Sequence, residues 1–154
     1  MLGKLFSLPS PYLMQNLKAI ATKYGVQVAF VVALTAMLGS LYYSEIAHFI
    51  PCTLCWYQRI LMYPLALILL VGLIEQDELV YNYVLPFSVV GICLSTYHYL
   101  IQQGLFGNTS TCNIGIPCSS RYVNYLGFIT IPFMALTAFV LITIFMWLRR
   151  RAVA

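Results

Sequence analysis

Two pairs of cysteines are the residues of this sequence with the clearest chemical potential. Cys52 and Cys55 stand three residues apart in Pro-Cys-Thr-Leu-Cys, and Cys112 and Cys118 enclose five residues. A disulfide between Cys52 and Cys55 would close a very small ring, which removes little loop entropy and stabilises a fold only slightly. We therefore interpret the first pair as a redox centre rather than a structural disulfide.

The second pair, taken alone, favours the opposite interpretation, because most disulfides of extracytoplasmic loops are structural. Its loop contains Gly115 and Pro117, which allow a compact turn. Two dithiols on one face, however, can exchange disulfides with each other. We therefore expect the second pair to meet a soluble partner and the first pair to pass the electrons on.

Arg59 adds a permanent charge beside the first pair. It follows Cys55 by four residues, so a helix that begins near Pro51 carries both on one face, with Arg59 one turn deeper. The helix N-terminus and this cation both favour a thiolate at the pair. An arginine in this place can also simply snorkel toward the interface, and the sequence alone leaves both interpretations open.

The elements that must position these residues are membrane helices. Hydrophobic residues make up 62% of the 154 residues and charged residues only 8%, whereas soluble domains carry about 25% charged residues. Four apolar stretches reach the roughly 20 residues needed to cross a bilayer. They cover about 24–44, 56–74, 80–101 and 125–148. We expect a single all-α membrane domain over 1–154, built as a four-transmembrane-helix bundle.

Positive charges set the orientation of this bundle. Lysines precede the first span and Arg149–Arg151 follow the fourth, so the positive-inside rule places both termini in the cytoplasm. The outside loops, about 45–55 and 102–124, then contain all four paired cysteines. The pairs would face the oxidising, extracytoplasmic side of the plasma membrane. The net charge of +4 comes from the chain ends and does not indicate nucleic acid binding.

Residues 1–23 lack the apolar segment of a cleavable signal. Leu13, Leu17, Ile20 and Tyr24 share one helical face, which predicts a short helix on the inner membrane surface. A frayed tail fits these residues equally well.

Small residues and prolines predict how the spans pack. Gly91 and Ser95 form a small-xxx-small pattern that favours a close helix contact, and Cys93 is expected to be a packed apolar residue beside them. Prolines inside three spans are expected to kink them, because neighbouring helices can satisfy the freed backbone groups. These prolines are Pro64, Pro86 and Pro132.

The place of the first pair, at the lip of a membrane helix, predicts a membrane quinone as the electron acceptor. A quinone headgroup accepts two electrons and two protons, and Arg59 would stabilise its reduced anion. His98, near the outer end of the third span, could hydrogen-bond a quinone oxygen or carry a proton. A lone interfacial histidine is more often only packed, and the case for His48 is weaker still.

A metal site is the competing interpretation of the cysteines. Four thiolates could bind zinc tetrahedrally. The two spacings match no zinc ribbon, however, and the outside face is oxidising. We therefore expect no metal.

These motifs together resemble the DsbB family of disulfide-generating quinone reductases. The resemblance rests on four spans, on Pro-Cys-x-x-Cys-x-x-x-Arg at the start of the second, and on a cysteine pair between the third and fourth. The stretches PCTLCWYQRILMYPLALIL and CNIGIPCSSRYVNYLGFITIPF look especially like the Gram-positive BdbC type. Gram-negative members have a longer second loop, and they carry glutamate where this chain has Gln58.

The resemblance implies a role for each matching cysteine. Cys112 would form a mixed disulfide with a thioredoxin-fold oxidase of the DsbA or BdbD type, and Cys118 would exchange with Cys52. Cys55 would be the thiolate next to the quinone, stabilised by Arg59. The acceptor would be menaquinone or ubiquinone, with menaquinone favoured for a Gram-positive source. The resting pairing stays open between 52–55 with 112–118 and an inter-loop 52–118 disulfide.

Two other interpretations remain. The chain could be a non-enzymatic four-span scaffold whose two disulfides only brace its outside loops. It could also be a VKOR-type quinone reductase, which likewise has four helices and two cysteine pairs. In that family the Cys-x-x-Cys follows the loop pair in chain order, whereas here it comes first, and this order favours the DsbB interpretation.

Overall fold

The computed structural model describes residues 11–105, 117–119, 122–123 and 128–153. The elements are α1 (Pro11–Leu41), a short π-helix η1 (Tyr42–Ile46), α2 (Thr53–Ile74), α3 (Tyr81–Gln102) and α4 (Ile131–Val153). All four α-helices are long and apolar enough to cross a membrane. The predicted all-α architecture is confirmed for the described residues, which contain no strand.

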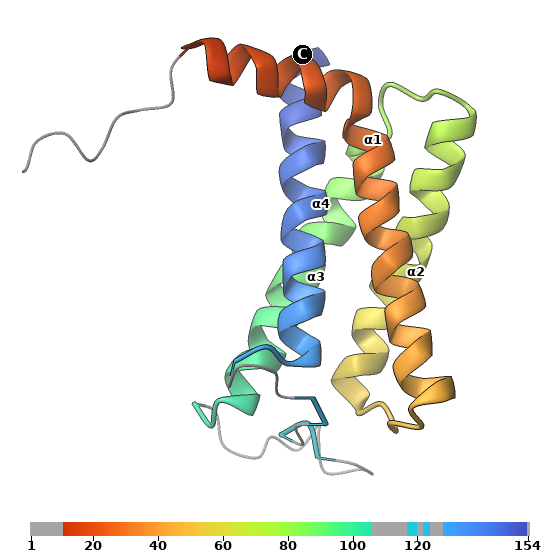
Figure 1. The fold of residues 1–154 in the computed structure, drawn as a ribbon, viewed down its shortest axis with the longest axis vertical. Coiled ribbons are helices and arrows are strands. Elements are labelled where there is room, and N and C mark those ends of the chain that lie inside the picture. Colours follow the sequence, from red (N-terminus) through yellow and green to blue (C-terminus); the bar gives the residue numbers. More distant parts are fainter. Residues whose placement is uncertain (1–10, 106–116, 120–121, 124–127, 154) are drawn as a thin grey trace, which may run out of the picture.

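The four helices form a closed ring of neighbours. α1 packs on α4 and α2, and α3 packs on α2 and α4. The first turns of α1 run across one end of the bundle before the helix bends and follows the bundle axis (Figure 1). The C-terminal end of α4 lies at that same end. The predicted N-terminal helix is therefore confirmed from Pro11 onward, while its contact with a membrane surface and the cytoplasmic location of this end stay predictions.

One hydrophobic core joins the four helices. It includes Ala29 and Ala33 of α1, Leu65 and Leu69 of α2, Val84 of α3, and Phe139 and Ile142 of α4. Gly91 of α3 lies directly against the ring of Phe139, and a Cβ at this position would collide with that ring. Ser95, one turn further along α3, is also fully buried. The predicted small-residue contact is therefore confirmed, and its partner is α4.

The boundaries of the helices differ from the predicted spans at three places. α2 begins at Thr53 rather than near 56, with Cys52 as its N-cap, so the prediction that the Cys-x-x-Cys lies at the start of this helix is confirmed. α4 begins at Ile131 and not near 125, because Pro132 fits the first turn of a helix, where its missing N–H is no loss. Pro132 therefore does not kink α4, and that prediction was wrong. α4 ends at Val153 rather than near 148. Arg150 and Arg151 lie in its last turn, where their positive charges stabilise the helix C-terminus.

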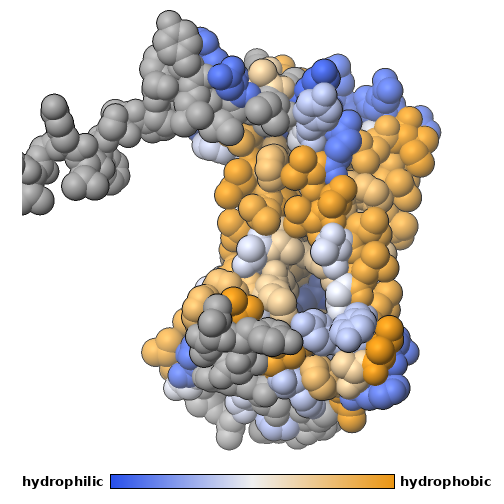
Figure 2. Space-filling view, viewed as in Figure 1, coloured by the Kyte–Doolittle hydropathy of each residue, from blue (hydrophilic) through white to orange (hydrophobic). Residues whose placement is uncertain are grey.

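The outer surface of the bundle matches a chain that spans a membrane. Figure 2 shows hydrophobic side chains over the middle of the bundle and hydrophilic ones gathered toward its ends. Among the large apolar side chains that point outward are Val31, Leu38, Ile60, Leu67, Val71, Val90 and Ile144. Cys93 is also exposed on α3, so the prediction that it packs inside the chain was wrong. Its neighbours in sequence, Ile92 and Leu94, are the more buried residues.

Candidate active site

The first turn of α2 positions the redox pair. Cys52 is the N-cap residue of the helix, and its carbonyl accepts the backbone N–H of Trp56 at 3.1 Å. Cys55 follows one turn later, so both side chains leave the same end of the helix. The two Sγ atoms lie 3.1 Å apart and share a hydrogen bond, whereas a disulfide would hold them at about 2.05 Å. The pair is thus a dithiol in this structure.

Cys118 lies in the same buried cluster as Cys52. The cluster also contains Leu54 of α2 and Ile101 of α3, and Cys118 itself is only 1% exposed. Cys118 is disulfide-bonded, and it is not bonded to Cys52 or Cys55, whose thiols are free. This structure therefore does not contain the inter-loop 52–118 pairing. Cys112, the other predicted member of the second pair, lies outside the described residues.

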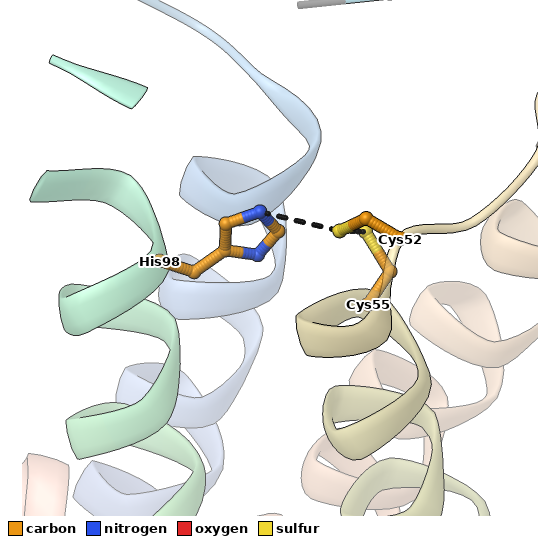
Figure 3. A group of neighbouring side chains, drawn as sticks. All are labelled: Cys52, Cys55 and His98. Carbon is orange, nitrogen blue, oxygen red and sulfur yellow. Dashed lines mark hydrogen bonds between the residues drawn. The ribbon is translucent and has the colours of Figure 1, made fainter. Parts of the chain in front are cut away.

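His98 reaches the dithiol from α3. Its side chain is fully buried, and its Nε2 lies 3.6 Å from Cys52 Sγ (Figure 3). On the other side of the ring, the amide nitrogen of Gln58 lies 3.4 Å from Nδ1. An amide nitrogen can only donate, so Nδ1 accepts and the proton of the neutral ring is on Nε2. His98 therefore donates a hydrogen bond to the sulfur of Cys52.

These contacts favour a negative charge on Cys52. The hydrogen bond between Cys52 and the Cys55 thiol, joined by the hydrogen bond with His98, lowers the pKa of Cys52 to about 4, although burial opposes the shift. Cys52 is 7% exposed, so little water is present to screen these contacts. In the dithiol state the thiolate thus lies on Cys52. The expected role of Cys55 as the thiolate next to a quinone stays a prediction.

Arg59 is held in place by the end of α1. Its Nε donates to Ser40 Oγ at 2.8 Å, and its Nη2 donates to the Ser40 carbonyl at 3.0 Å. The guanidinium also lies over the ring of Trp56, 5.3 Å from the ring centre. Two hydrogen bonds to a neighbouring helix oppose free snorkelling, because they fix the fork in one orientation. Arg59 lines the same cavity as Cys55, as the spacing predicted.

A cavity of about 540 Å³ opens in front of the dithiol. Its walls are mostly apolar side chains of α1, α2 and α4, and its polar groups include Arg59, Gln58 and His98. Figure 2 shows a hollow on the face formed by α1 and α4, with hydrophilic atoms at its base. The volume lies in the range of small-molecule sites, which typically combine apolar walls with a few polar groups.

Three aromatic rings stack beside this cavity and join the loop before α2 to the loop before α4. Phe49 lies between Tyr43, with ring centres 5.9 Å apart, and Tyr122, at 5.0 Å. All three rings line the cavity. Tyr43 belongs to the π-helix that ends the first span, an irregularity often found at functional sites. The stack connects the loop of Cys52 to the loop of Cys118.

Sequence reasoning missed several of these residues. Ser40 and the aromatic stack carried no signal, because their partners are distant in sequence. Gln58 was noted only as a departure from glutamate, and not as the partner of His98. The weaker candidate, His48, is exposed and has a left-handed backbone with φ of 54°. It does not line the cavity.

Comparison with known proteins identifies the relatives of this chain. The sequence model of the family described as "Disulfide bond formation protein DsbB" matches residues 23–149. "Disulfide bond formation protein C" of Bacillus subtilis strain 168 is 58% identical over 121 residues, which cover 78% of this chain and 88% of that protein. "Probable disulfide formation protein C" of Halalkalibacterium halodurans is 54% identical, over 75% of this chain and 85% of its own length. No solved structure matches this chain.

Proposed function

The chain belongs to the DsbB family of disulfide bond formation proteins, and from that premise we propose that it transfers electrons from a thioredoxin-fold thiol oxidase to a membrane quinone. Membership of the family makes it a multi-pass membrane oxidoreductase. The finer assignment rests on one observation above all: a dithiol at Cys52 and Cys55 lies beside the disulfide-bonded Cys118 and lines a cavity that also contains Arg59.

The proposed relay starts at the second cysteine pair. A thiolate of the reduced partner attacks Cys112, which forms a mixed disulfide and releases Cys118 as a thiolate. Cys118 then attacks Cys52 of the 52–55 disulfide, forms the 52–118 bond and releases Cys55 as a thiolate. Cys118 and Cys52 pack in one buried cluster, so this exchange needs only a local rearrangement.

The relay is completed by two further exchanges. The second thiolate of the partner breaks the mixed disulfide, so the partner leaves oxidised and Cys112 becomes a thiolate. Cys112 attacks Cys118, restores the 112–118 disulfide and leaves Cys52 and Cys55 as a dithiol. The electron pair that the partner lost is now on the first pair.

The cavity fits a quinone headgroup by size and by chemistry. Its apolar walls suit the ring, and Arg59 supplies a cation for an oxygen that becomes negative. Tyr63 also lines the cavity, and its buried hydroxyl has no hydrogen-bond partner within the described part of the chain. When bound, a quinone supplies an acceptor for two electrons and two protons. Menaquinone and ubiquinone share the two carbonyl oxygens that these groups would contact, so both are tested.

His98 has a role on the sulfur side of this step. Its Nε2–H stabilises the thiolate of Cys52, which makes Cys52 a better leaving group when Cys112 closes on Cys118. Arg59 lies in the cavity on the side of Cys55. We therefore propose that His98 stabilises the sulfur of Cys52 and that Arg59 stabilises negative charge in the cavity. The cysteines are proposed to face the extracytoplasmic side, where the soluble partner is oxidised.

The experiment is anaerobic quinone reduction by the purified protein, with a reduced DsbA-type dithiol protein as donor. We expect stoichiometric loss of quinone absorbance in the wild type and none in Cys55→Ser or Cys112→Ser. Exposed Cys93 provides the matched control, because Cys93→Ser should retain full turnover. Absence of turnover with both quinones in folded protein would instead support the scaffold interpretation.

A further inference from the structure

Three metal-ligand atoms converge at the outer end of the bundle. Cys52 Sγ, Cys55 Sγ and His98 Nε2 or Nδ1 all lie within 4.8 Å of one another. The three side chains come from two helices and meet at the edge of the cavity (Figure 3). Two thiolates and one imidazole form a ligand set typical of zinc sites that keep one position open.

The distances fit a tetrahedral ion. With Zn–S of about 2.3 Å and Zn–N of about 2.0 Å, a tetrahedral site separates sulfur from nitrogen by roughly 3.5 Å and sulfur from sulfur by roughly 3.8 Å. The observed distance from Cys52 Sγ to His98 Nε2 is 3.6 Å. The two sulfurs, at 3.1 Å, must separate slightly. Cys55 can provide this shift by rotating its side chain, because it is only partly buried.

Gln58 can orient His98 as a ligand. A metal at Nε2 requires the ring proton on Nδ1, and a metal-bound histidine usually donates that proton to an oxygen. Rotation of the Gln58 amide would present its oxygen to Nδ1 in place of its nitrogen, which now lies 3.4 Å away. Two thiolates neutralise a divalent ion. Arg59 lines the same cavity, and its positive charge repels a cation. Two hydrogen bonds to Ser40 hold its guanidinium in place.

We propose that the reduced active site is a redox-gated binding site for Zn²⁺, formed by Cys52, Cys55 and His98. The site exists only as a dithiol, because a 52–55 disulfide has no thiolate to offer. Binding moves no electrons. It displaces the thiol proton of Cys55, and the ring proton of His98 moves from Nε2 to Nδ1. A bound ion would hold the pair reduced and stop the relay. This regulatory consequence rests on the proposed function, whereas the binding itself does not.

The binding test uses Co²⁺ as a spectroscopic probe. In a background of Cys93→Ser, Cys112→Ser and Cys118→Ser, the first pair holds the only thiols of the chain. We expect one Co²⁺ per reduced protein, a thiolate-to-cobalt charge-transfer band, and loss of that band on addition of Zn²⁺. Oxidised protein should show no band. If the folded, reduced protein gives no thiolate band at stoichiometric Co²⁺, the proposal is wrong.

Histidine variants separate this site from a simple dithiol chelate. His98→Asn should weaken cobalt binding at least tenfold, whereas the matched variant His48→Asn should leave it unchanged. His48 is exposed and has a left-handed backbone that asparagine tolerates. Equal affinity in both variants would exclude His98 as a ligand. If His98→Asn does not fold, Gln58→Leu replaces it, with an expected loss of about tenfold or more.

A turnover assay tests the regulation. Zn²⁺ should inhibit quinone reduction reversibly by chelator, and Mg²⁺, which prefers oxygen ligands, should not. In the variant Gln58→Leu, inhibition should require a higher Zn²⁺ concentration, by the same factor by which this variant loses affinity for cobalt. Cobalt binding without zinc inhibition would overturn the regulatory role. Cobalt binding in a protein that reduces no quinone would instead refute the proposed function, while the metal site stands on its own spectrum.

Discussion

At the scale of single residues, the site is an asymmetric dithiol. Cys52 shares hydrogen bonds with Cys55 and with His98, whereas Arg59 and its partner Ser40 lie deeper along the cavity. The helix N-terminus adds a favourable dipole to the same end. Two chemically identical side chains in one short motif thus acquire different environments. The proposed relay requires this difference, because each cysteine has a different role in it.

The pKa of Cys52 provides the first prediction. Its value of about 4 means that Cys52 stays a thiolate as pH falls from 9.0, the ordinary value, and is protonated only near pH 4. In the reduced protein, ionisation of Cys52 therefore favours the folded state increasingly as pH rises between these values. Alkylation of the first pair by a small neutral reagent should show its inflection near pH 4. An inflection near pH 9 would contradict the assignment.

A pair of variants tests the cause of this shift. Cys55→Ala removes the hydrogen bond that contributes most to it, so the inflection for Cys52 should move to higher pH. Cys55→Ser retains a hydroxyl donor and should keep more of the shift. If both variants titrate alike, the neighbour's hydrogen bond is not the main cause.

Arg59 provides a second prediction at this scale. A hydrogen bond to a charged group contributes about 1.5–3 kcal/mol, so Arg59→Ala should lower kcat/KM for quinone by roughly tenfold to a hundredfold. Arg59→Lys keeps the charge but loses the planar guanidinium that makes two hydrogen bonds to Ser40. Its kcat/KM for quinone should therefore lie between those of the wild type and Arg59→Ala. Reoxidation of the partner's thiol by a preformed 52–55 disulfide should be unaffected. A loss in that single-turnover step would assign Arg59 to folding instead.

At the scale of elements, the loop before α2 and the loop before α4 are joined by aromatic packing. The stack of Tyr43, Phe49 and Tyr122 links the end of the first span to both loops. Aromatic pairs of this kind contribute about 0.5–1.5 kcal/mol each beyond their buried area. Such a link keeps the loop of Cys118 near Cys52 without a covalent bond between the loops.

Phe49→Ala should therefore slow disulfide exchange between the two cysteine pairs. We expect about a tenfold slower reoxidation of the partner, because roughly 1 kcal/mol or more of packing between the loops is lost. Reduction of quinone by protein that is already reduced at the first pair should change less. Phe128→Ala is the control, since Phe128 packs on Phe133 away from the cavity. Equal slowing of both half-reactions would show that the stack shapes the quinone cavity instead.

At the scale of the whole molecule, close helix packing places the site at one end of the bundle. α3 and α4 approach at Gly91, where the ring of Phe139 fills the space that a side chain would need. α3 carries His98 two turns further on, so this contact helps to determine where the imidazole meets α2. The side chain of His98 is fully buried between the helices, so its imidazole cannot move to compensate for a shift of α3.

Gly91→Ala should destabilise the bundle by about 1–3 kcal/mol, the usual cost of overpacking. Thermal unfolding in detergent would measure the effect as a lower midpoint. Gly39→Ala is the matched control, because no atom lies within 4 Å of a Cβ placed there. Gly91→Ala combined with Phe139→Leu should recover part of the loss. If both glycine variants unfold alike, the contact is looser than described.

The sequence by itself determined what depends on local order and hydropathy. Long apolar runs must form helices in lipid, and Cys52, Cys55 and Arg59 share one helical face by spacing alone. The tertiary structure decided which distant groups meet. His98 on Cys52, Ser40 on Arg59, and Cys118 beside Cys52 are separated by many residues. Their meeting depends on how helices pack and loops fold back, and hydropathy does not specify these contacts because many rotations of an apolar helix bury similar surface.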